Sequence, residues 1–173
     1  MAELEQQYKE IVETGEVKTI KKFPHQLAYN VIPQIDVFQS NGYTKEEMKM
    51  YNETRKIMHT DARCSAMCVR VSSLRSHSES VWIETEQPIS VEAAQQAIAQ
   101  APGCTLVDDP ATLTYPMPKD TAGKDDVFVG RVRKDLSDEN GLTFWLSGDQ
   151  IRKGAALNAV QIGEYLIKVG NVK

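Results

Sequence analysis

Apolar side chains recur at a spacing of three to four over residues 2–14, which is the period of an amphipathic helix. They are Leu4, Tyr8, Ile11 and Val12. We therefore predict a helix at the start of the chain, which Gly15 ends. A second helix is predicted over residues 44–58, because Thr44 and Glu47 stand at the spacing of a capping box.

Short runs rich in Val, Ile, Phe and Trp predict β-strands. These runs lie at residues 66–71, 80–84, 104–107, 127–133 and 142–146, with a shorter one at 17–20. A third helix is predicted after Pro88-Ile89-Ser90, and Pro102-Gly103 stops it. This order of elements predicts an α+β fold, in which helices cover one face of a mixed or antiparallel sheet.

The last predicted helix, residues 150–169, is apolar nearly all round. Its apolar side chains are Ile151, Ala155, Ala156, Ala159, Val160, Ile162, Leu166 and Ile167. A helix without a continuous polar face is buried from several sides, and Gly154 and Gly163 would let another backbone approach closely. We therefore expect this helix to pack against a second layer of protein.

The composition is that of an ordinary domain, with 173 residues of which 41% are apolar. A net charge of −4 gives no electrostatic support for nucleic acid or an anionic membrane as a partner, and no apolar run is long enough to span a bilayer. Three cysteines at irregular spacing, after an acidic start unlike a signal peptide, indicate a cytoplasmic protein without a disulfide framework. Cys64 and Cys68 lack nearby histidine pairs, so we expect no metal site.

An arginine and a histidine lie between two of the predicted strands. Arg70 is near the end of the run 66–71, and His77 is in the Ser-rich joint before the run 80–84. On one continuous strand they would lie roughly 23 Å apart on opposite faces, so they can meet only if the chain turns back in the joint. An anion-binding guanidinium and a titratable imidazole would form half of an active site. The alternative is a solvated strand charge and a hydrogen-bonded turn histidine.

Glu53 and Lys56 lie three positions apart on the predicted capped helix, so they share a face. This spacing by itself favours a weak surface ion pair, and Lys49, four positions before Glu53, would fit such a pair equally well. The functional alternative is a binding face for a zwitterionic or phosphate-bearing ligand.

Five blocks of sequence stand in order along the chain. They are Ala28-Tyr-Asn-Val-Ile-Pro-Gln-Ile-Asp36, Asn52-Glu-Thr-Arg-Lys56, Cys68-Val-Arg70 with His77-Ser-Glu79, Phe128-Val-Gly-Arg-Val-Arg-Lys-Asp135 and Arg152-Lys-Gly-Ala-Ala-Leu-Asn-Ala-Val-Gln-Ile162. Together they resemble the C-terminal catalytic and dimerisation domain of the aspartate-semialdehyde dehydrogenases, over nearly the whole chain.

The resemblance implies a fold and an activity. The fold is the α+β catalytic domain that this family shares with the glyceraldehyde-3-phosphate dehydrogenases. The activity is that of an NADP-dependent oxidoreductase that interconverts aspartyl phosphate and aspartate semialdehyde, on the route to lysine, threonine and methionine. The family also implies a homodimer formed through the sheet and a small-molecule substrate.

By the same resemblance, each matching residue has an expected role. His77 is the general acid/base that handles the proton of a cysteine nucleophile. Arg70 would pair with the substrate carboxylate, Glu53 would hold the substrate amino group, and Lys56 would lie near the phosphate. Asn158 would lie toward the carboxamide of the nicotinamide.

The resemblance does not extend to the nucleotide-binding half of the family. The glycine-rich phosphate loop, the cysteine nucleophile and the glutamine that orients the attack have no counterpart here, and none of the three cysteines stands in the nucleophile's motif. We therefore expect residues 1–173 to form a single substrate-binding and dimerisation domain. Residues 147–173 would pack against the nucleotide-binding domain, which would bind most of the NADP, and the chain alone would be inactive.

Two other functions fit parts of the same sequence. The chain could be a non-catalytic dimerisation or ligand-binding module derived from this family. A regulatory α+β sandwich that binds an amino acid would explain the order of elements, but it would not explain five ordered blocks.

Overall fold

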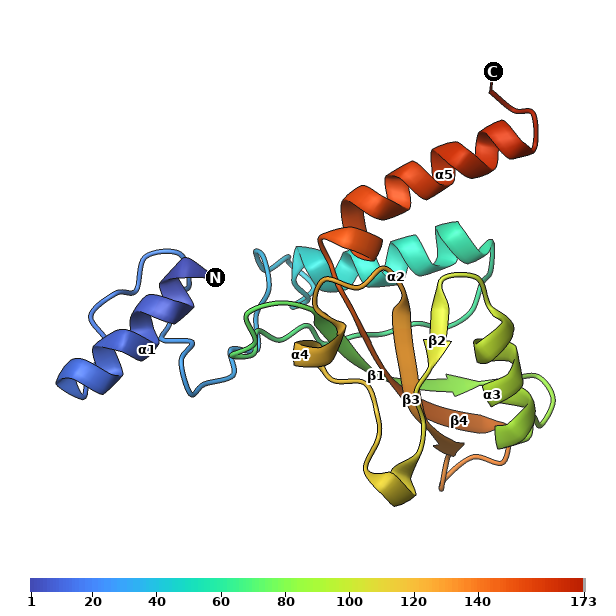
Figure 1. The fold of residues 1–173 in the computed structure, drawn as a ribbon, viewed down its shortest axis with the longest axis horizontal. Coiled ribbons are helices and arrows are strands. Elements are labelled where there is room, and N and C mark those ends of the chain that lie inside the picture. Colours follow the sequence, from blue (N-terminus) through green and yellow to red (C-terminus); the bar gives the residue numbers. More distant parts are fainter. Residues whose placement is uncertain (173) are drawn as a thin grey trace. The chain divides into compact units, whose positions relative to one another are not determined.

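The structure, a computed structural model, describes residues 1–172 and divides into two compact units, Met1–Leu74 and Arg75–Lys173. The first unit holds the helices α1 (Ala2–Thr14) and α2 (Lys45–Met58). The second holds the β-sheet and the remaining helices (Figure 1).

In the first unit, α1 confirms the predicted helix and buries Leu4 against a short apolar cluster made by the segment that follows it. The cluster consists of Leu4, Leu27, Ala28 and Ile32, with Tyr8, Ile11 and Phe23 packed around it. Gln7 fixes this segment from the helix, because its Oε1 accepts hydrogen bonds from the N–H groups of Leu27 and Ala28, both at 2.9 Å. A buried polar side chain of this kind replaces the ladder that a sheet would provide.

Two predicted strands of the first unit are wrong. Residues 17–20 are irregular, because the N–H groups of Lys18 and Thr19 donate to the carboxylate of Glu10 and not to a neighbouring strand. Residues 66–71 form only a single antiparallel bridge, between Arg70 and Ile32. In both segments a side chain or one short bridge satisfies the backbone, so no ladder extends.

The helix α2 begins as predicted. The N–H of Thr44 donates to Oε2 of Glu47 at 2.7 Å, and the N–H of Glu47 donates to Oγ1 of Thr44 at 3.3 Å. This reciprocal pair is a capping box, which satisfies two N–H groups that the first helical turn leaves without partners. The other oxygen of Glu47 accepts from the N–H of Cys68 at 2.9 Å, so the start of α2 also holds the segment that leads to Arg70.

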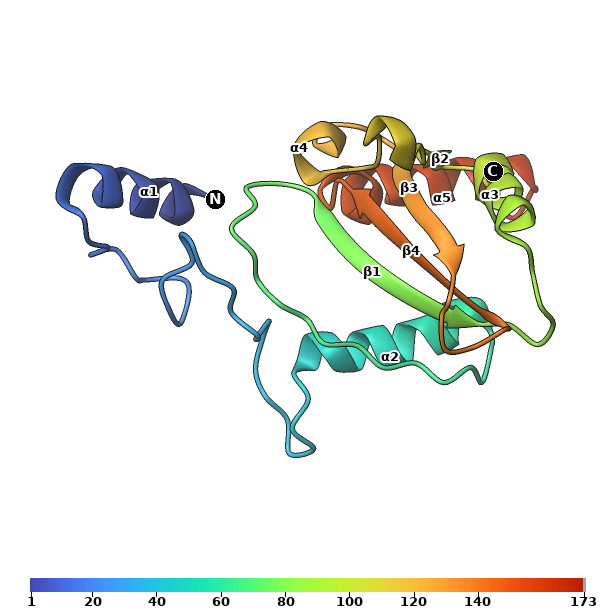
Figure 2. The same ribbon diagram turned by 90° about the horizontal axis from the view of Figure 1, so that it is seen from below.

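The second unit is built on a mixed sheet of four strands in the order β1-β4-β3-β2, which confirms the predicted α+β fold. The strands are β1 (His77–Glu84), β2 (Cys104–Leu106), β3 (Val127–Lys134) and β4 (Gly141–Gly148). β1 and β3 flank β4 in antiparallel pairs, and β2 joins β3 in parallel (Figure 2).

One face of this sheet packs against the helix α3 (Val91–Gln100), which Ser90 caps with its hydroxyl. The buried centre is formed by Ala94, Val129, Val132 and Leu142, with Ile89, Val91, Ile98, Leu106, Val127, Phe144 and Leu146 around it. A short 3₁₀ turn (Pro110–Thr112) and the helix α4 (Pro118–Thr121) lie in the connection from β2 to β3.

A bulge interrupts β3 between Gly130 and Arg133. A Cβ atom at Gly130 would lie 2.1 Å from the carbonyl oxygen of Val107, so only glycine fits there. Next to it, Arg131 has a φ of 57°, and the carboxylate of Asp108 accepts from the N–H groups of Arg131 and Val132 at 2.8 and 2.9 Å.

The predicted last helix is present as a π-helical turn (Arg152–Ala156) followed by α5 (Leu157–Lys168). None of the residues of α5 is buried in this chain. Apolar side chains such as Val160, Ile162 and Ile167 are more than half exposed along it, at 58%, 53% and 62%.

Candidate active site

His77 is the first residue of β1, which is one of the two edge strands of the sheet, and its side chain is exposed. The strand therefore begins three residues earlier than predicted, and His77 belongs to it rather than to the Ser-rich joint. The carbonyl oxygen of His77 accepts a hydrogen bond from Oγ of Ser147, at 3.2 Å, and the residue lies opposite Gly148 of β4. The backbone of the histidine is thus held while the imidazole remains accessible.

The residue before His77 has an unusual backbone. Ser76 has a φ of 72°, in the left-handed region, and is only 6% exposed. For a residue other than glycine this conformation costs on the order of 1–3 kcal/mol, and it persists where surrounding contacts impose it. One such contact is the hydrogen bond from the N–H of Ser76 to Oε1 of Gln150, at 2.9 Å.

An ion pair between a half-buried arginine and a buried carboxylate precedes this residue. Nε of Arg75 lies 2.8 Å from Oδ2 of Asp149, whose side chain has no exposed surface. Burial by itself raises the pKa of the Asp149 carboxyl, but the N–H groups of Gly123 and Ile151, the Arg75 guanidinium and the N–H of Arg152 outweigh it and lower the pKa to about 2. Asp149 is therefore ionised at neutral pH.

Glu53 and Lys56 lie on α2, and both side chains are exposed. The surface ion pair that their spacing favours is not formed. Lys49 pairs instead with Glu46, at 2.6 Å, and among residues 1–172 no ion pair involves Glu53 or Lys56. Both charges are therefore available to a ligand.

Arg70 is half-buried, and two hydrogen bonds join its backbone to that of Ile32. Its N–H donates to the carbonyl of Ile32 at 2.9 Å, and its carbonyl accepts from the N–H of Ile32 at 3.0 Å. The guanidinium lies over the ring of Phe23, 5.5 Å from the centroid. A ring in this position restricts the orientation of the guanidinium.

Asn158 is the second residue of α5 and is half-buried. It lies with His77 in the second unit, whereas Glu53, Lys56 and Arg70 lie in the first. The structure thus places two predicted site residues in one unit and three in the other.

No metal centre is evident in the described part of the chain. Across residues 1–172, no three His, Cys, Asp or Glu side chains are grouped so as to hold a metal ion, and no disulfide joins Cys64, Cys68 or Cys104. All three cysteines are half-buried. No helix within the same range is long and apolar enough to cross a membrane.

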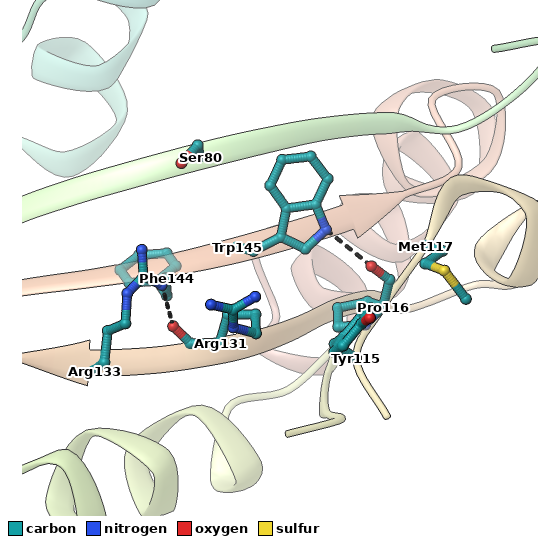
Figure 3. Close-up of a pocket in the computed structure, with 8 residues that line it drawn as sticks. All are labelled: Ser80, Tyr115, Pro116, Met117, Arg131, Arg133, Phe144 and Trp145. Atoms are coloured by element: carbon teal, nitrogen blue, oxygen red, sulfur yellow. Dashed lines mark hydrogen bonds between the residues drawn. The ribbon is translucent and has the colours of Figure 1, made fainter. Parts of the chain in front are cut away.

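The second unit also has a hollow of about 330 Å³ on the sheet. It is lined by Ser80, Tyr115, Pro116, Met117, Arg131, Arg133, Phe144 and Trp145 (Figure 3). The indole N–H of Trp145 donates to the carbonyl of Pro116 at 2.8 Å, which fixes one wall. None of the predicted site residues lines this hollow.

The structure adds residues that the sequence did not single out. Ser147 contacts the backbone of His77, and Arg75, two residues before it, pairs with Asp149. All three stand outside the five blocks. One local signal was available for Asp149, since an aspartate before a helix is a common N-terminal cap. Nothing local predicts that the same carboxylate meets Arg75.

Comparisons with known proteins agree on one family. The family model described as "semialdehyde dehydrogenase, dimerisation domain" matches residues 1–153. An aspartate-semialdehyde dehydrogenase of Aquifex aeolicus is 52% identical over 169 residues, which make up 97% of this chain and 50% of that protein. The chain spans about half the length of the curated relatives it matches.

Solved structures give the same result. The structure of aspartate semialdehyde dehydrogenase II from Vibrio cholerae complexed with ASA has a TM-score of 0.90 and 42% identity, covering 96% of this chain and 49% of that chain. The enzyme of Candida albicans with NADP has a TM-score of 0.64 at 21% identity, covering 85% of this chain and 47% of that one. The second likeness is one of fold alone.

Proposed function

The chain belongs to the semialdehyde dehydrogenase family by its dimerisation domain, and from this premise we propose that it is the substrate-binding and acid/base part of an NADP-dependent aspartate-semialdehyde dehydrogenase. The enzyme would interconvert aspartyl phosphate and aspartate semialdehyde, in the synthesis of lysine, threonine and methionine. The observation that carries this proposal is the 52% identity to the Aquifex aeolicus enzyme across 97% of the chain.

His77 is proposed as the general acid/base. An imidazole titrates near neutral pH, so it can take the proton of the enzyme's thiol as that thiol attacks and return it to the thiolate when the product leaves. The thiol would come from the part of the enzyme outside the matched half, and NADP, when bound, would exchange the hydride. The exposure of His77 on a backbone held by Ser147 suits a group that must reach a reacting atom repeatedly in one orientation.

Arg70, Glu53 and Lys56 are proposed to bind the substrate. A guanidinium binds a carboxylate through two parallel hydrogen bonds, and the contact with the ring of Phe23 would hold Arg70 in one orientation for this. Glu53 would bind the substrate ammonium, and Lys56 the phosphate. Because neither is engaged in an ion pair in residues 1–172, no internal pair has to break before the ligand binds.

The last helix is proposed to meet the nucleotide-binding domain, with residues 147–173 as the packing segment and Asn158 directed toward the nicotinamide carboxamide. Its exposed apolar side chains support this, since an apolar helix without a buried residue is stabilised by covering it. That domain would hold most of the NADP.

The assembly is proposed to be a homodimer formed through the sheet, in the cytoplasm. The face of β1 opposite the α3 side carries Ser78, Ser80 and Trp82, and Trp82 is 62% exposed. An exposed tryptophan on an open sheet face is typical of an interface core. The description of the matching family as a dimerisation domain supports a second copy as its partner.

The test is phosphate-dependent reduction of NADP with aspartate semialdehyde. We expect no turnover from the 173 residues alone. In a complete enzyme that contains them, we expect His77→Asn to lower kcat by about 10²- to 10⁴-fold, the usual effect of losing a general acid/base. His25→Asn is the matched control, because His25 is also exposed but lies outside all five blocks.

Two outcomes would overturn the proposal. An unchanged kcat in His77→Asn would remove the acid/base role. Turnover by the 173 residues alone, abolished by changing Cys64, Cys68 or Cys104, would mean that one of these cysteines is the nucleophile.

A further inference from the structure

Two consecutive residues before His77 are tied to two consecutive residues after β4. Arg75 forms an ion pair with the buried carboxylate of Asp149, and the N–H of Ser76 donates to the side chain of Gln150. From this arrangement we propose that Asp149 is a positioning residue that acts through Arg75 to set the direction of the His77 side chain. The inference rests on the acid/base role proposed above for His77.

The Asp149 carboxylate is suited to this because it cannot rotate without losing several partners. Its Oδ2 lies 2.8 Å from Nε of Arg75 and accepts from the N–H of Gly123 at 2.6 Å. Its Oδ1 accepts from the N–H groups of Ile151 and Arg152 at 2.9 and 3.3 Å. Each oxygen thus has two partners, and the side chain has no exposed surface.

The strained backbone of Ser76 links the Arg75–Asp149 pair to His77. Ser76 lies between Arg75 and His77 and keeps its left-handed φ of 72° only while its neighbours are held. On the other side, Ser147 holds the carbonyl of His77. If the Arg75 anchor is lost, Ser76 can relax toward an ordinary conformation, and the Cα–Cβ bond of His77 turns with it.

The same carboxylate organises the start of the last helix through Ile151 and Arg152, and that helix carries Asn158. The buried carboxylate of Asp149 therefore influences the orientation of both candidate site residues of the second unit, His77 and Asn158. Neither Asp149 nor Arg75 has to touch substrate for this effect, so their loss should lower kcat with little change in KM.

The first experiment uses NMR on the full 173-residue chain and observes the side chain of His77. We expect Arg75→Met to shift the rotamer populations of the His77 side chain, as seen in its Hα–Hβ couplings, and Arg75→Lys to shift them back in part. Arg75→Met is preferred to Asp149→Asn, because it leaves the buried carboxylate with its three N–H donors. The matched control is Arg152→Met, which removes a guanidinium that pairs with the exposed Asp125 at the same helix start.

The second experiment measures kinetics in a complete enzyme that contains these residues. We expect Arg75→Met to lower kcat by about 10- to 100-fold with KM for aspartate semialdehyde within about twofold, because a misplaced catalytic group costs rate rather than binding. Partial recovery in Arg75→Lys is expected.

An unaltered His77 rotamer in folded Arg75→Met would overturn the positioning role. So would the same rotamer change in Arg152→Met, because the effect would then be a general loosening of the helix start. A His77 rotamer that responds to Arg75→Met in an enzyme whose rate is insensitive to His77→Asn would uphold the positioning and reject only the acid/base role of His77.

Discussion

The hydroxyl of Ser147 lies 3.2 Å from the carbonyl oxygen of His77, on the strand that pairs with the one His77 begins. The same hydroxyl is 2.8 Å from Oγ1 of Thr121 in α4 and accepts from Oγ of Ser78 at 3.2 Å. Ser147 is fully buried. It therefore joins the first two residues of β1, which include the candidate acid/base, to α4.

Replacing this serine by alanine should destabilise the second unit. Ser147→Ala removes the hydroxyl that the carbonyl of His77 and the hydroxyl of Ser78 bind, and leaving such groups without this partner costs about 1–3 kcal/mol. Both tryptophans lie in residues 75–173, so their fluorescence during urea unfolding reports on this unit. Ser78→Ala, which removes one partly buried bond, should cost less than half as much; equal costs would argue against Ser147 as the centre of the network.

The capping box of α2 should be measurable by hydrogen exchange. Thr44→Ala removes the side-chain acceptor of the Glu47 N–H, and caps of this kind are worth about 1 kcal/mol. Amides in the first turns of α2 should exchange faster by about fivefold, which is that energy expressed as a ratio. Thr54→Ala, inside the same helix, should be neutral or stabilising because alanine has the higher helix propensity. Similar exchange in both variants would contradict the role of the box.

The first unit should lose stability in acid through Glu10. The hydroxyl of Thr19, the N–H groups of Lys18 and Thr19, and Gln6 all donate to its carboxylate, which lowers its pKa from 4.5 to about 2 against a smaller effect of desolvation. Between those values the unfolded chain binds the proton more tightly than the folded chain does. The contribution is therefore complete above pH 4.5 and is lost as the pH falls toward 2.

This dependence can be followed by urea titration of the α1 amides in NMR spectra at pH 5 and pH 3. Glu10→Gln should reduce the difference between the two pH values, because the Glu10 carboxyl no longer titrates; the carboxyls of Glu3 and Glu47, whose pKa values are also lowered by hydrogen bonds from backbone N–H groups, retain the remainder. Glu5→Gln, on the exposed side of the same helix, should leave the difference unchanged. A wild-type stability of α1 that does not fall from pH 5 to pH 3 would sink the prediction.

Replacement by glycine should be tolerated at Arg131, inside the bulge of β3, and not at Arg133, where regular pairing resumes. Arg131 has a φ of 57°, which glycine adopts without strain, so Arg131→Gly should change stability by less than about 0.5 kcal/mol. Arg133 lies in the regular part of the strand opposite Thr143, and Arg133→Gly should cost about 1 kcal/mol. Urea unfolding compares the two directly, and a larger cost for Arg131→Gly would mean that its side chain matters more than its backbone.

The proposed dimer face can be tested at Trp82. Trp82→Glu places a charge where the proposal has a buried apolar contact, so sedimentation velocity should show a monomer at concentrations at which the unmodified protein is a dimer. Leu136→Glu is the control, because Leu136 is fully exposed in the turn between β3 and β4. A Trp82→Glu protein that remains dimeric would place the interface elsewhere.

Elements whose causes are local were predictable from the sequence. The helices α1 and α2 were predicted because apolar periodicity and a capping box act over a few residues. The runs of the second unit that were predicted as strands do form strands, because each of them finds a partner strand in the sheet. The runs 17–20 and 66–71 have the same composition but no ladder to join, and composition does not reveal whether a partner strand exists.

The sequence by itself determined the α+β class, the family and the residues proposed to meet substrate, because these depend on periodicity and on ordered blocks that lie along the chain. Only the tertiary structure decided what holds those residues. Ser76 and Gln150 are 74 residues apart, and their contact, like that of Arg75 with Asp149, forms because β1 pairs with β4. Pairing between distant segments depends on the whole fold, so no local pattern could identify the buried carboxylate beside His77.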